Sequence, residues 1–337
     1  MVRLKDIAAI ARVSVMTVSK ALRDAPDVSA ATREKIRTLA AQMGYVPDSS
    51  AQGLRSRTTK FFGLVIPATT NPIYARMVYG IEERAFELGY DLIIAHTLNK
   101  PERENLVLRR MLSRRVDGLF VTPVYRFEAT ARIYEEIAAR NIPTVLLGPP
   151  APFCKNFPGV EIEEQLASYH VTKHLIGLGH KKIAYFTGPT AAPWAHERFE
   201  GYRRALREAN IEPDDELVFQ SGNTIEDGTN AALQMLNEGC QPTALQAVSD
   251  AVAIGAAEVL LQQGLRIPED ISVAGFGNIL LAEHFRVPLT TARQPKFRLG
   301  IAAVEMMMQQ IRGEKISTVR LPAEVIERQS SAAPKAG

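Results

Sequence analysis

The amino-acid sequence predicts an α/β protein with an N-terminal helix-turn-helix head and two doubly wound parallel-sheet lobes. From Phe61 onwards, near-continuous apolar runs of strand length alternate with amphipathic stretches of helical length, which is typical of parallel sheets covered by helices on both faces. These runs are too numerous to form a single sheet, so we expect two lobes with a break after Gly148. Before residue 61 the pattern is of short helices only.

Residues 1–46 are predicted to form three short helices. The first carries an apolar stripe that begins at Leu4 and recurs at helical spacing. Ser14 stands at the N-cap position of a second helix, in "VSVMTVSKAL", and Ser29 can cap a third helix that ends at Gly44. Two helices joined by a tight turn and followed by a third predict a helix-turn-helix module.

The charge of the chain is unevenly distributed. Residues 1–60 hold 11 Lys and Arg against 5 Asp and Glu, whereas the remaining 277 residues hold 29 against 32. A basic head on a mildly acidic body indicates that the head binds a polyanion, although chance clustering on a solvated face would give the same balance.

Composition excludes several classes of protein. No apolar run approaches the roughly 18 residues of a membrane span, and the N-terminus meets charged residues too early for a signal peptide. Cys154 and Cys240 show no paired spacing, so neither a disulfide framework nor a structural zinc site is indicated. We therefore expect a cytoplasmic protein that needs no cofactor and contacts no membrane.

The segments "LKDIAAIARVSVMTVSKAL", "VSAATREKI" and "MGYVPDSSAQGL" resemble the head and hinge of the lactose-repressor (LacI) family of bacterial transcription regulators. In the body, "NPIYARMVYGIEERAFELGYDLIIA", "VDGLFVTP", "GHKKIAYFTGP", "RFEGYRRAL", "PEDISVAGFGN" and "PLTTARQP" resemble the same family in the same order. The resemblance implies a DNA-binding domain over 1–46, a hinge helix or linker over 47–60, and a periplasmic-binding-protein-like body over 61–337. The implied function is that of a transcriptional repressor whose affinity for operator DNA is controlled by a small-molecule effector.

By this resemblance, the helix that follows Ser14 enters the major groove. Val15 and Met16 occupy positions that read base edges, where apolar side chains would select thymine methyl groups, and Lys20 would donate to a guanine edge. Hydroxyl groups and the other cations would hold phosphates. The alternative is that Val15 and Met16 belong to the core, although other residues of the helix already supply its apolar face. The head residues expected to bind DNA are Ser14, Val15, Met16, Thr17, Ser19, Lys20, Arg23, Ser29 and Arg33.

The turn between the first two helices departs from the family's pattern. The position that often holds glycine is Arg12 in this sequence. If the backbone is left-handed there, a residue other than glycine costs about 1 kcal/mol.

The linker segment "SSAQGL" resembles the hinge helix that folds on operator DNA. Leu54 is the residue that would wedge into the minor groove, Ala51 lies on the same helical side, and Arg55 can reach a phosphate. A passive linker with a stray leucine is the alternative.

Several polar and aromatic side chains are expected at a cleft between the two lobes. Asp250 and Arg198 match positions that commonly hydrogen-bond the effector in the family, and a carboxylate with a guanidinium suits vicinal hydroxyls. Tyr74 and Trp194 would stack on the apolar face of a sugar ring. The expected effector-binding residues are Asn71, Tyr74, His96, Trp194, Arg198, Asn223, Asp250 and Gln294.

The expected effector is a monosaccharide, a short oligosaccharide or a sugar acid. Arg198 favours a carboxylate- or phosphate-bearing sugar. A purine-like corepressor is the main rival, since stacking and amide recognition suit a base equally well. A structural cap or ion pair is the alternative role for Asp250 and Arg198, and a place at the edge of the core is the alternative for His96.

A doubly wound enzyme with an accessory DNA-binding head is the remaining alternative. The sequence has no phosphate-binding loop of the G-x-x-x-x-G-K-[ST] type, and "GFGNIL" lacks the third glycine of a dinucleotide site. His170 and His174 stand four residues apart without a third ligand in pattern, so a solvated helix face is favoured over a metal pair.

A homodimer is the expected assembly. Two-fold dimers match pseudo-palindromic operators, because each subunit meets one half-site. The C-terminal segment "ERQSSAAPKAG" shows no leucine heptad of the kind that would join two dimers.

The hinge assignment predicts the effect of Leu54→Ala. Removing the wedge should weaken binding to the specific operator, whereas salt-dependent binding to random DNA should persist because it depends on cations. A gel-shift titration at fixed salt measures both, and an unchanged operator affinity would contradict the role assigned to Leu54.

Overall fold

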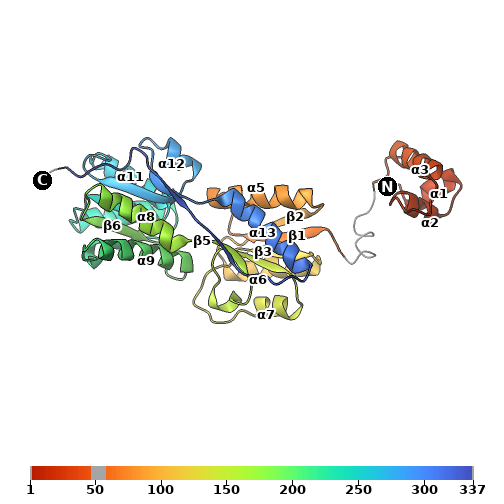
Figure 1. Ribbon diagram of the computed structural model, residues 1–337, viewed down its shortest axis with the longest axis horizontal. Coiled ribbons are helices and arrows are strands. Elements are labelled where there is room, and N and C mark those ends of the chain that lie inside the picture. The colour runs from red at the N-terminus through yellow and green to blue at the C-terminus, as the bar shows by residue number, and fades with distance from the viewer. Residues whose placement is uncertain (1, 47–57, 336–337) are drawn as a thin grey trace. The chain divides into compact units, whose positions relative to one another are not determined.

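The computed structural model describes residues 2–46 and 58–335 of the chain (Figure 1). They belong to two compact units, Met1–Thr59 and Lys60–Gly337. In the part of the chain that the structure describes, no helix is long and apolar enough to cross a membrane.

The N-terminal unit is a three-helix module with one small core. The helices pack through their apolar stripes, as the sequence pattern predicts, and Val18 and Ile36 are fully buried at the centre. Gly44, just past the third helix, has a φ of +64°, which glycine adopts without strain. The helices are α1 (Leu4–Ala11), α2 (Val15–Ala21) and α3 (Ala30–Gln42).

Side-chain caps set where α2 and α3 begin. The Ser14 hydroxyl accepts a hydrogen bond from the backbone N–H of Thr17 at 3.0 Å, and the Ser29 hydroxyl accepts one from Thr32 at 3.3 Å. Both N-caps predicted from the sequence are thereby confirmed. Arg12 ends α1 in the left-handed region, with φ 56° and ψ 47°, so the strain expected at this non-glycine position is present.

The larger unit contains two six-stranded sheets, each the centre of one lobe. In the first lobe the order is β11-β5-β4-β3-β1-β2, and in the second it is β12-β10-β9-β8-β6-β7. All neighbouring strands run parallel except β10 and β12, which are antiparallel. The predicted fold class, a helical head followed in the chain by two doubly wound lobes, is confirmed.

The elements of each lobe come from more than one stretch of the chain. The first lobe holds β1 (Phe61–Ile66), α5 (Pro72–Glu87), β2 (Asp91–His96), α6 (Pro101–Ser113), β3 (Gly118–Val121), α7 (Arg132–Ala139), β4 (Thr144–Leu147), η1 (Pro152–Cys154), β5 (Gly159–Ile162), α13 (Lys296–Ile311) and β11 (Val319–Leu321). The second holds α8 (Glu164–Gly177), β6 (Ile183–Thr187), α9 (Pro193–Glu208), η2 (Asp215–Leu217), β7 (Val218–Gln220), α10 (Ile225–Asn237), β8 (Ala244–Ala247), α11 (Asp250–Gln262), β9 (Ser272–Gly277), α12 (Leu280–His284), β10 (Thr290–Arg293) and β12 (Glu324–Ile326).

The predicted break between the lobes after Gly148 is wrong. The first lobe continues through β5, and the chain crosses to the second lobe only between Ile162 and Glu164. It returns between β10 and α13 and crosses again between β11 and β12, so that α13 lies beside α5 in Figure 1. The four-residue strand "GVEI" is too short to stand out in a proline-rich stretch, which is why the sequence pattern missed it.

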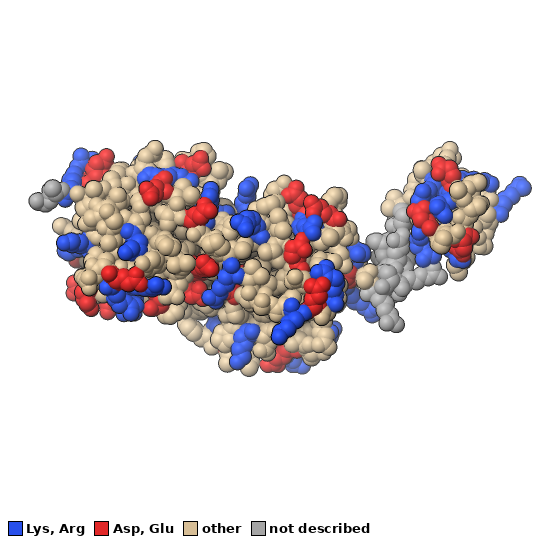
Figure 2. Space-filling view, in the orientation of Figure 1, with Lys and Arg blue, Asp and Glu red and all other residues tan. Residues whose placement is uncertain are grey.

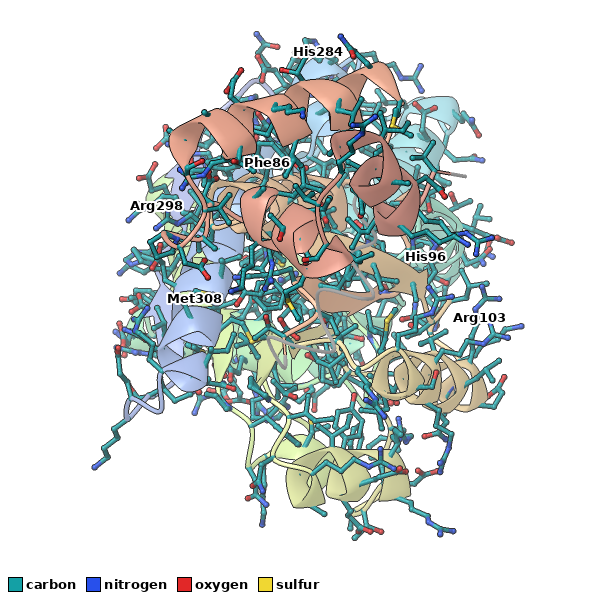
Figure 3. All side chains as sticks on the ribbon, turned by 90° about the vertical axis from the view of Figure 1, so that its right-hand side faces the viewer. Phe86, His96, Arg103, His284, Arg298 and Met308 are labelled. Atoms are coloured by element: carbon teal, nitrogen blue, oxygen red, sulfur yellow. The ribbon has the colours of Figure 1, made fainter. Side chains whose placement is uncertain are left out.

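Strand periodicity divides each lobe into two apolar layers. On β1, Phe62 and Leu64 point into the layer under α5 and α13, whereas Val65 points into the layer under α6 and α7. Figure 3 shows Met308 of α13 and Arg103 of α6 on opposite sides of this lobe. Over the visible face of both lobes, acidic and basic side chains are interspersed (Figure 2).

Glycines let α5 and α13 approach each other closely. A Cβ atom on Gly80 would lie 2.4 Å from the carbonyl oxygen of Phe297, and one on Gly300 would lie 2.4 Å from that of Met77. Because both obstacles are backbone atoms, the two helices must separate to accept any larger residue.

Gly80→Ala should lower the free energy of unfolding by about 1–3 kcal/mol, the usual cost of overpacking. Urea denaturation measures the change. Gly177→Ala in α8 is a matched control, because nothing lies within 4 Å of its added Cβ, and alanine there should be neutral or stabilising by up to about 1 kcal/mol. Equal stability of Gly80→Ala and the wild type would contradict the tight helix contact.

Candidate functional site

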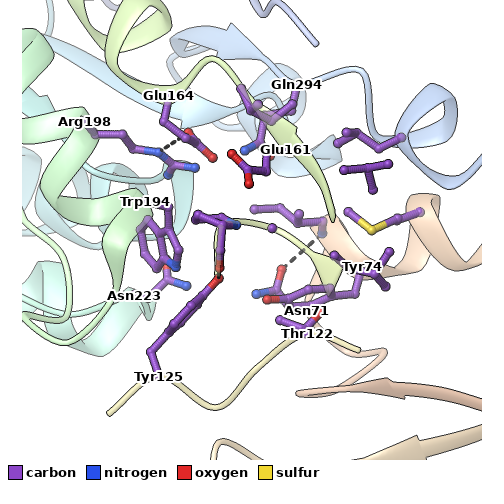
Figure 4. A pocket seen from close by; sticks show the side chains of 18 residues that line it. Asn71, Tyr74, Thr122, Tyr125, Glu161, Glu164, Trp194, Arg198, Asn223 and Gln294 are labelled. Carbon is purple, nitrogen blue, oxygen red and sulfur yellow. Dashed lines mark hydrogen bonds and ion pairs between the residues drawn. The ribbon is translucent and has the colours of Figure 1, made fainter. Parts of the chain in front are cut away.

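A pocket opens between the two lobes of the larger unit (Figure 4). It encloses about 640 Å³ of empty space, part of which is open to solvent. Elements of both lobes line it, and the predicted residues that do so are Asn71, Tyr74, Trp194, Arg198, Asn223 and Gln294.

Sheet topology places the pocket. In both sheets the strand order reverses after the first strand of the lobe, between β1 and β3 and between β6 and β8. Ligands of doubly wound folds bind at the carboxyl ends of the strands at such a reversal. Asn71 and Thr122 follow β1 and β3, whereas Trp194 and Arg198 lie in the first two turns of α9, which follows β6. Residues from both reversals therefore meet here.

Asp250, predicted as an effector ligand, does not line the pocket. Its buried carboxylate accepts hydrogen bonds from Thr291 Oγ1 at 2.5 Å and from the backbone N–H of Ile279 at 2.8 Å. Burial raises the pKa of Asp250 despite these two hydrogen bonds. Asp250 therefore ties the start of α11 to β10 and to the loop after β9. A structural role describes Asp250 better than the predicted role of effector ligand.

His96 also lies outside the pocket lining. It ends β2, the edge strand of its sheet, and is therefore displaced from the strand reversal at β1 and β3. Its carbonyl oxygen accepts a hydrogen bond from Arg103 Nε at 2.7 Å, and Figure 3 shows the two residues on the same side of the lobe. His96 is therefore better described as a residue at the edge of the core than as an effector ligand.

Arg198 is buried in the pocket wall with its charge already paired. Its Nε donates to Glu164 Oε2 at 2.7 Å, and its Nη1 donates to the carbonyl oxygen of Val248 at 2.6 Å. The guanidinium also lies over the Trp194 ring, 4.7 Å from its centroid. Because Glu164 compensates the charge of the guanidinium, Arg198 favours an anionic sugar less than the sequence alone suggests.

Sequence reasoning missed four polar residues of the lining: Thr122, Tyr125, Glu161 and Glu164. Glu161 lies within the short strand β5, where its Oε2 accepts a hydrogen bond from Arg320 Nε at 2.9 Å. Tyr125 donates its hydroxyl to the carbonyl oxygen of Pro149 at 2.9 Å. The motif "GVEIEE" would have indicated Glu161 and Glu164 as pocket residues only if β5 had been recognised as a strand.

Other lining groups keep hydrogen-bonding capacity. Asn71 Oδ1 caps α5 by accepting from the Ile73 N–H at 3.1 Å, which leaves its amide hydrogens for another partner. Gln294 Oε1 is buried and has no hydrogen-bond partner among the described residues, which costs about 1–3 kcal/mol unless a ligand or water supplies a donor. Burial raises the pKa of Tyr74 to about 12, so its phenol is neutral at pH 7.

In the helix-turn-helix module, α2 presents its first two residues to solvent. Val15 is 46% exposed and Met16 is 51% exposed, so the alternative that they are core residues is wrong. Lys20 is engaged in an ion pair with Asp27, although both side chains are substantially exposed.

The remaining head residues expected at phosphates make local contacts. Arg33 Nη2 donates to the carbonyl oxygens of Ala25 and Val28, each at 3.1 Å, and so braces the loop before α3. Arg23 Nε donates to the carbonyl oxygen of Ser19 at 2.9 Å. The hinge residues Ala51, Leu54 and Arg55 lie outside the residues that the structure describes.

Comparison with known proteins identifies the family. A family model described as "Periplasmic binding proteins and sugar binding domain of LacI family" matches residues 59–329, and one described as "Bacterial regulatory proteins, lacI family" matches residues 3–48. The chain belongs to the LacI family. The resemblance seen in the sequence is thereby confirmed.

Individual LacI-family members match over nearly their whole length. The ribose operon repressor of Haemophilus influenzae is 35% identical over 334 residues, which cover 98% of each chain. The HTH-type transcriptional repressor PurR of Aliivibrio salmonicida is 32% identical over 339 residues, which cover 98% of this chain and 99% of the relative. The crystal structure of the lac repressor dimer bound to operator and the anti-inducer ONPF is similar with a TM-score of 0.88 and 28% sequence identity. The match covers 98% of this chain and 99% of the repressor chain.

The ring nitrogens of His174, one of the two histidines considered as a metal pair, face other protein groups. His174 Nε2 is hydrogen-bonded to Ser331 Oγ at 2.9 Å, and its Nδ1 lies 3.4 Å from a Glu327 carboxylate oxygen. In residues 2–46 and 58–335, no group of three or more His, Cys, Asp or Glu side chains is arranged to hold a metal ion. His174 thus fastens the C-terminal segment to α8.

Asp250→Ala should lower the free energy of unfolding by about 1–3 kcal/mol, because the Thr291 hydroxyl and the Ile279 N–H both lose a buried acceptor. Asn223→Ala is the control: its side chain lines the pocket without a hydrogen bond to any described residue, and its stability should change by less than about 0.5 kcal/mol. Urea denaturation without added ligand compares the two, and an unaltered stability of Asp250→Ala would contradict the structural role.

Proposed function

We propose that this LacI-family regulator represses transcription by binding a pseudo-palindromic operator as a homodimer, and that a neutral, polyhydroxylated effector in the pocket controls its operator affinity. The observation that carries the effector class is the pocket itself. Arg198 is the one cationic side chain among the described lining residues, and Glu164 neutralises it. A carbohydrate without an acidic group matches such a lining.

Three further features of the lining support a carbohydrate. Amide groups of Asn71, Asn223 and Gln294 offer both donors and acceptors, as vicinal hydroxyls require. Trp194 and Tyr74 offer apolar ring faces. The matching family model is described as a sugar-binding domain, and one relative is named as a ribose operon repressor.

The head supports operator recognition by apolar contact. Val15 and Met16, exposed at the start of α2, meet the requirement for readers of thymine methyl groups. We propose that Ser14, Thr17 and the nearby cations hold phosphates, and that the hinge residues Ala51, Leu54 and Arg55 reach the minor groove, as the family resemblance implies.

Exposed apolar groups on both lobes support the homodimer. Phe86 at the end of α5 is 71% exposed and Leu280 on α12 is 72% exposed. Ile94 is exposed on β2, the edge strand of its sheet. Unpaired edges and exposed aromatic rings are features that a partner subunit covers.

We also propose that the protein has no enzymatic activity and acts in the cytoplasm, where operator DNA is accessible.

The experiment that tests this function measures operator binding of the full chain by fluorescence anisotropy, with and without a panel of neutral sugars that includes D-ribose, D-glucose and cellobiose. One of them should change the operator affinity at least about tenfold, a coupling of about 1.4 kcal/mol. Asn223→Ala should abolish that change and leave operator affinity without sugar intact. A response to purine bases with none to sugars would contradict the effector class and leave the regulator in place.

Met16→Ala should weaken preference for the operator by about 1–3 kcal/mol at one base pair, because a methyl contact is lost, and should leave binding to random DNA at the same salt unchanged. Ile10→Ala is the matched control, since Ile10 is an equally exposed apolar residue on α1. Competition of operator variants in a gel shift provides the measurement. Identical preferences for Met16→Ala and the wild type would rule out base reading by this side chain.

A further inference from the structure

One end of the pocket holds side-chain oxygens with unused hydrogen-bond acceptor capacity. Glu161, Glu164 and Gln294 lie together there, as Figure 4 shows. The bonds to protein use only one oxygen of each glutamate: Glu161 Oε2 accepts from Arg320, and Glu164 Oε2 accepts from Arg198. Gln294 Oε1 is buried without a partner among the described residues. A ligand group that contacts these oxygens must therefore bring hydrogens of its own.

The two carboxylates at this end differ in how well they are neutralised. Glu164 pairs with Arg198, and both side chains are buried, so their charges cancel at close range. Arg320, the partner of Glu161, has 55% of its side chain exposed, so water screens its charge, whereas Glu161 itself is 3% exposed. The negative charge of Glu161 is thus the less compensated one inside the pocket.

A third carboxylate competes for the same arginine. Arg320 Nη2 lies 3.8 Å from Glu197 Oε1, on α9 of the other lobe. Burial raises the pKa of Glu197, and the carboxylates of Glu164 and Glu161 add to this effect. Three carboxyl groups therefore lie near two guanidinium groups around this end of the pocket, and of the three only Glu161 and Glu164 line it.

We propose that Glu161 is a specificity-determining residue: its carboxylate binds a hydroxyl or ammonium hydrogen of the effector and excludes sugars that carry a carboxylate or phosphate at this end. This inference rests on the proposed function, because it assumes that the pocket is the effector site. It adds the residue and the charge rule by which the pocket distinguishes sugars of the same shape.

The test compares sugars that differ mainly in charge, by isothermal titration calorimetry on the full chain. The matched sets are D-glucose with D-glucosamine and D-glucuronate, and D-ribose with D-ribose 5-phosphate. In the set whose neutral member binds, the wild type should bind the anionic member at least about tenfold more weakly, a difference of about 1.4 kcal/mol. Glu161→Gln, which keeps the shape of the side chain, should reduce this gap to about twofold or less.

Two further variants separate charge from shape. Glu161→Asp keeps the charge and should keep the discrimination, even where its overall affinity falls. Glu197→Gln touches the same Arg320 but does not line the pocket, so the ratio of neutral to anionic affinity should stay within about twofold of the wild type. Thermal denaturation of each variant confirms that the comparison is between folded proteins.

The outcomes separate this inference from the proposed function. An anionic sugar that binds as tightly as its neutral counterpart, or an unchanged ratio in Glu161→Gln, overturns the role of Glu161 while the regulator remains sugar-responsive. A protein that binds no sugar of any charge contradicts the proposed effector class, and the inference about Glu161 falls with it.

Discussion

The parallel pairing of strands is the constraint on which the rest of this structure depends. Parallel neighbours end at the same edge of a sheet, and in both lobes the order reverses after the first strand, so the loops on either side of the reversal diverge. Asn71 of the first lobe and Arg198 of the second reach the pocket only because of these two reversals. The three crossings of the chain join the lobes beside the same edges.

Burial then decides which polar groups serve the fold and which remain for a ligand. The carboxylate of Asp250 is already hydrogen-bonded to Thr291 and Ile279. Two nitrogens of Arg198 are already hydrogen-bonded to Glu164 and Val248. A buried charge without such partners would be costly, so the pocket wall had to supply them. The consequence for function is that a buried and paired charge, such as that of Arg198, does not by itself predict the charge of the ligand.

The head follows a different principle, because its core is small and its surface carries the function. Ser14 and Ser29 satisfy the free N–H groups at the helix starts, and Val18 fills the centre. Val15 and Met16 are left exposed, although apolar side chains normally gain by burial. Their exposure is consistent with the proposed contact with base edges in a DNA groove.

The sequence by itself determined the elements with strong local signals: the three helices of the head, two of them with serine caps, the apolar strands beginning at Phe61, and the family to which the chain belongs. It also indicated six of the residues that line the pocket, Asn71, Tyr74, Trp194, Arg198, Asn223 and Gln294. Only the tertiary structure decided that β5 belongs to the first lobe, that Asp250 is a structural group, and that Glu161 and Glu164 face the pocket. Periodicity and capping act between residues close in the chain, whereas an ion pair such as that of Glu161 with Arg320 joins residues that only the completed sheet brings together.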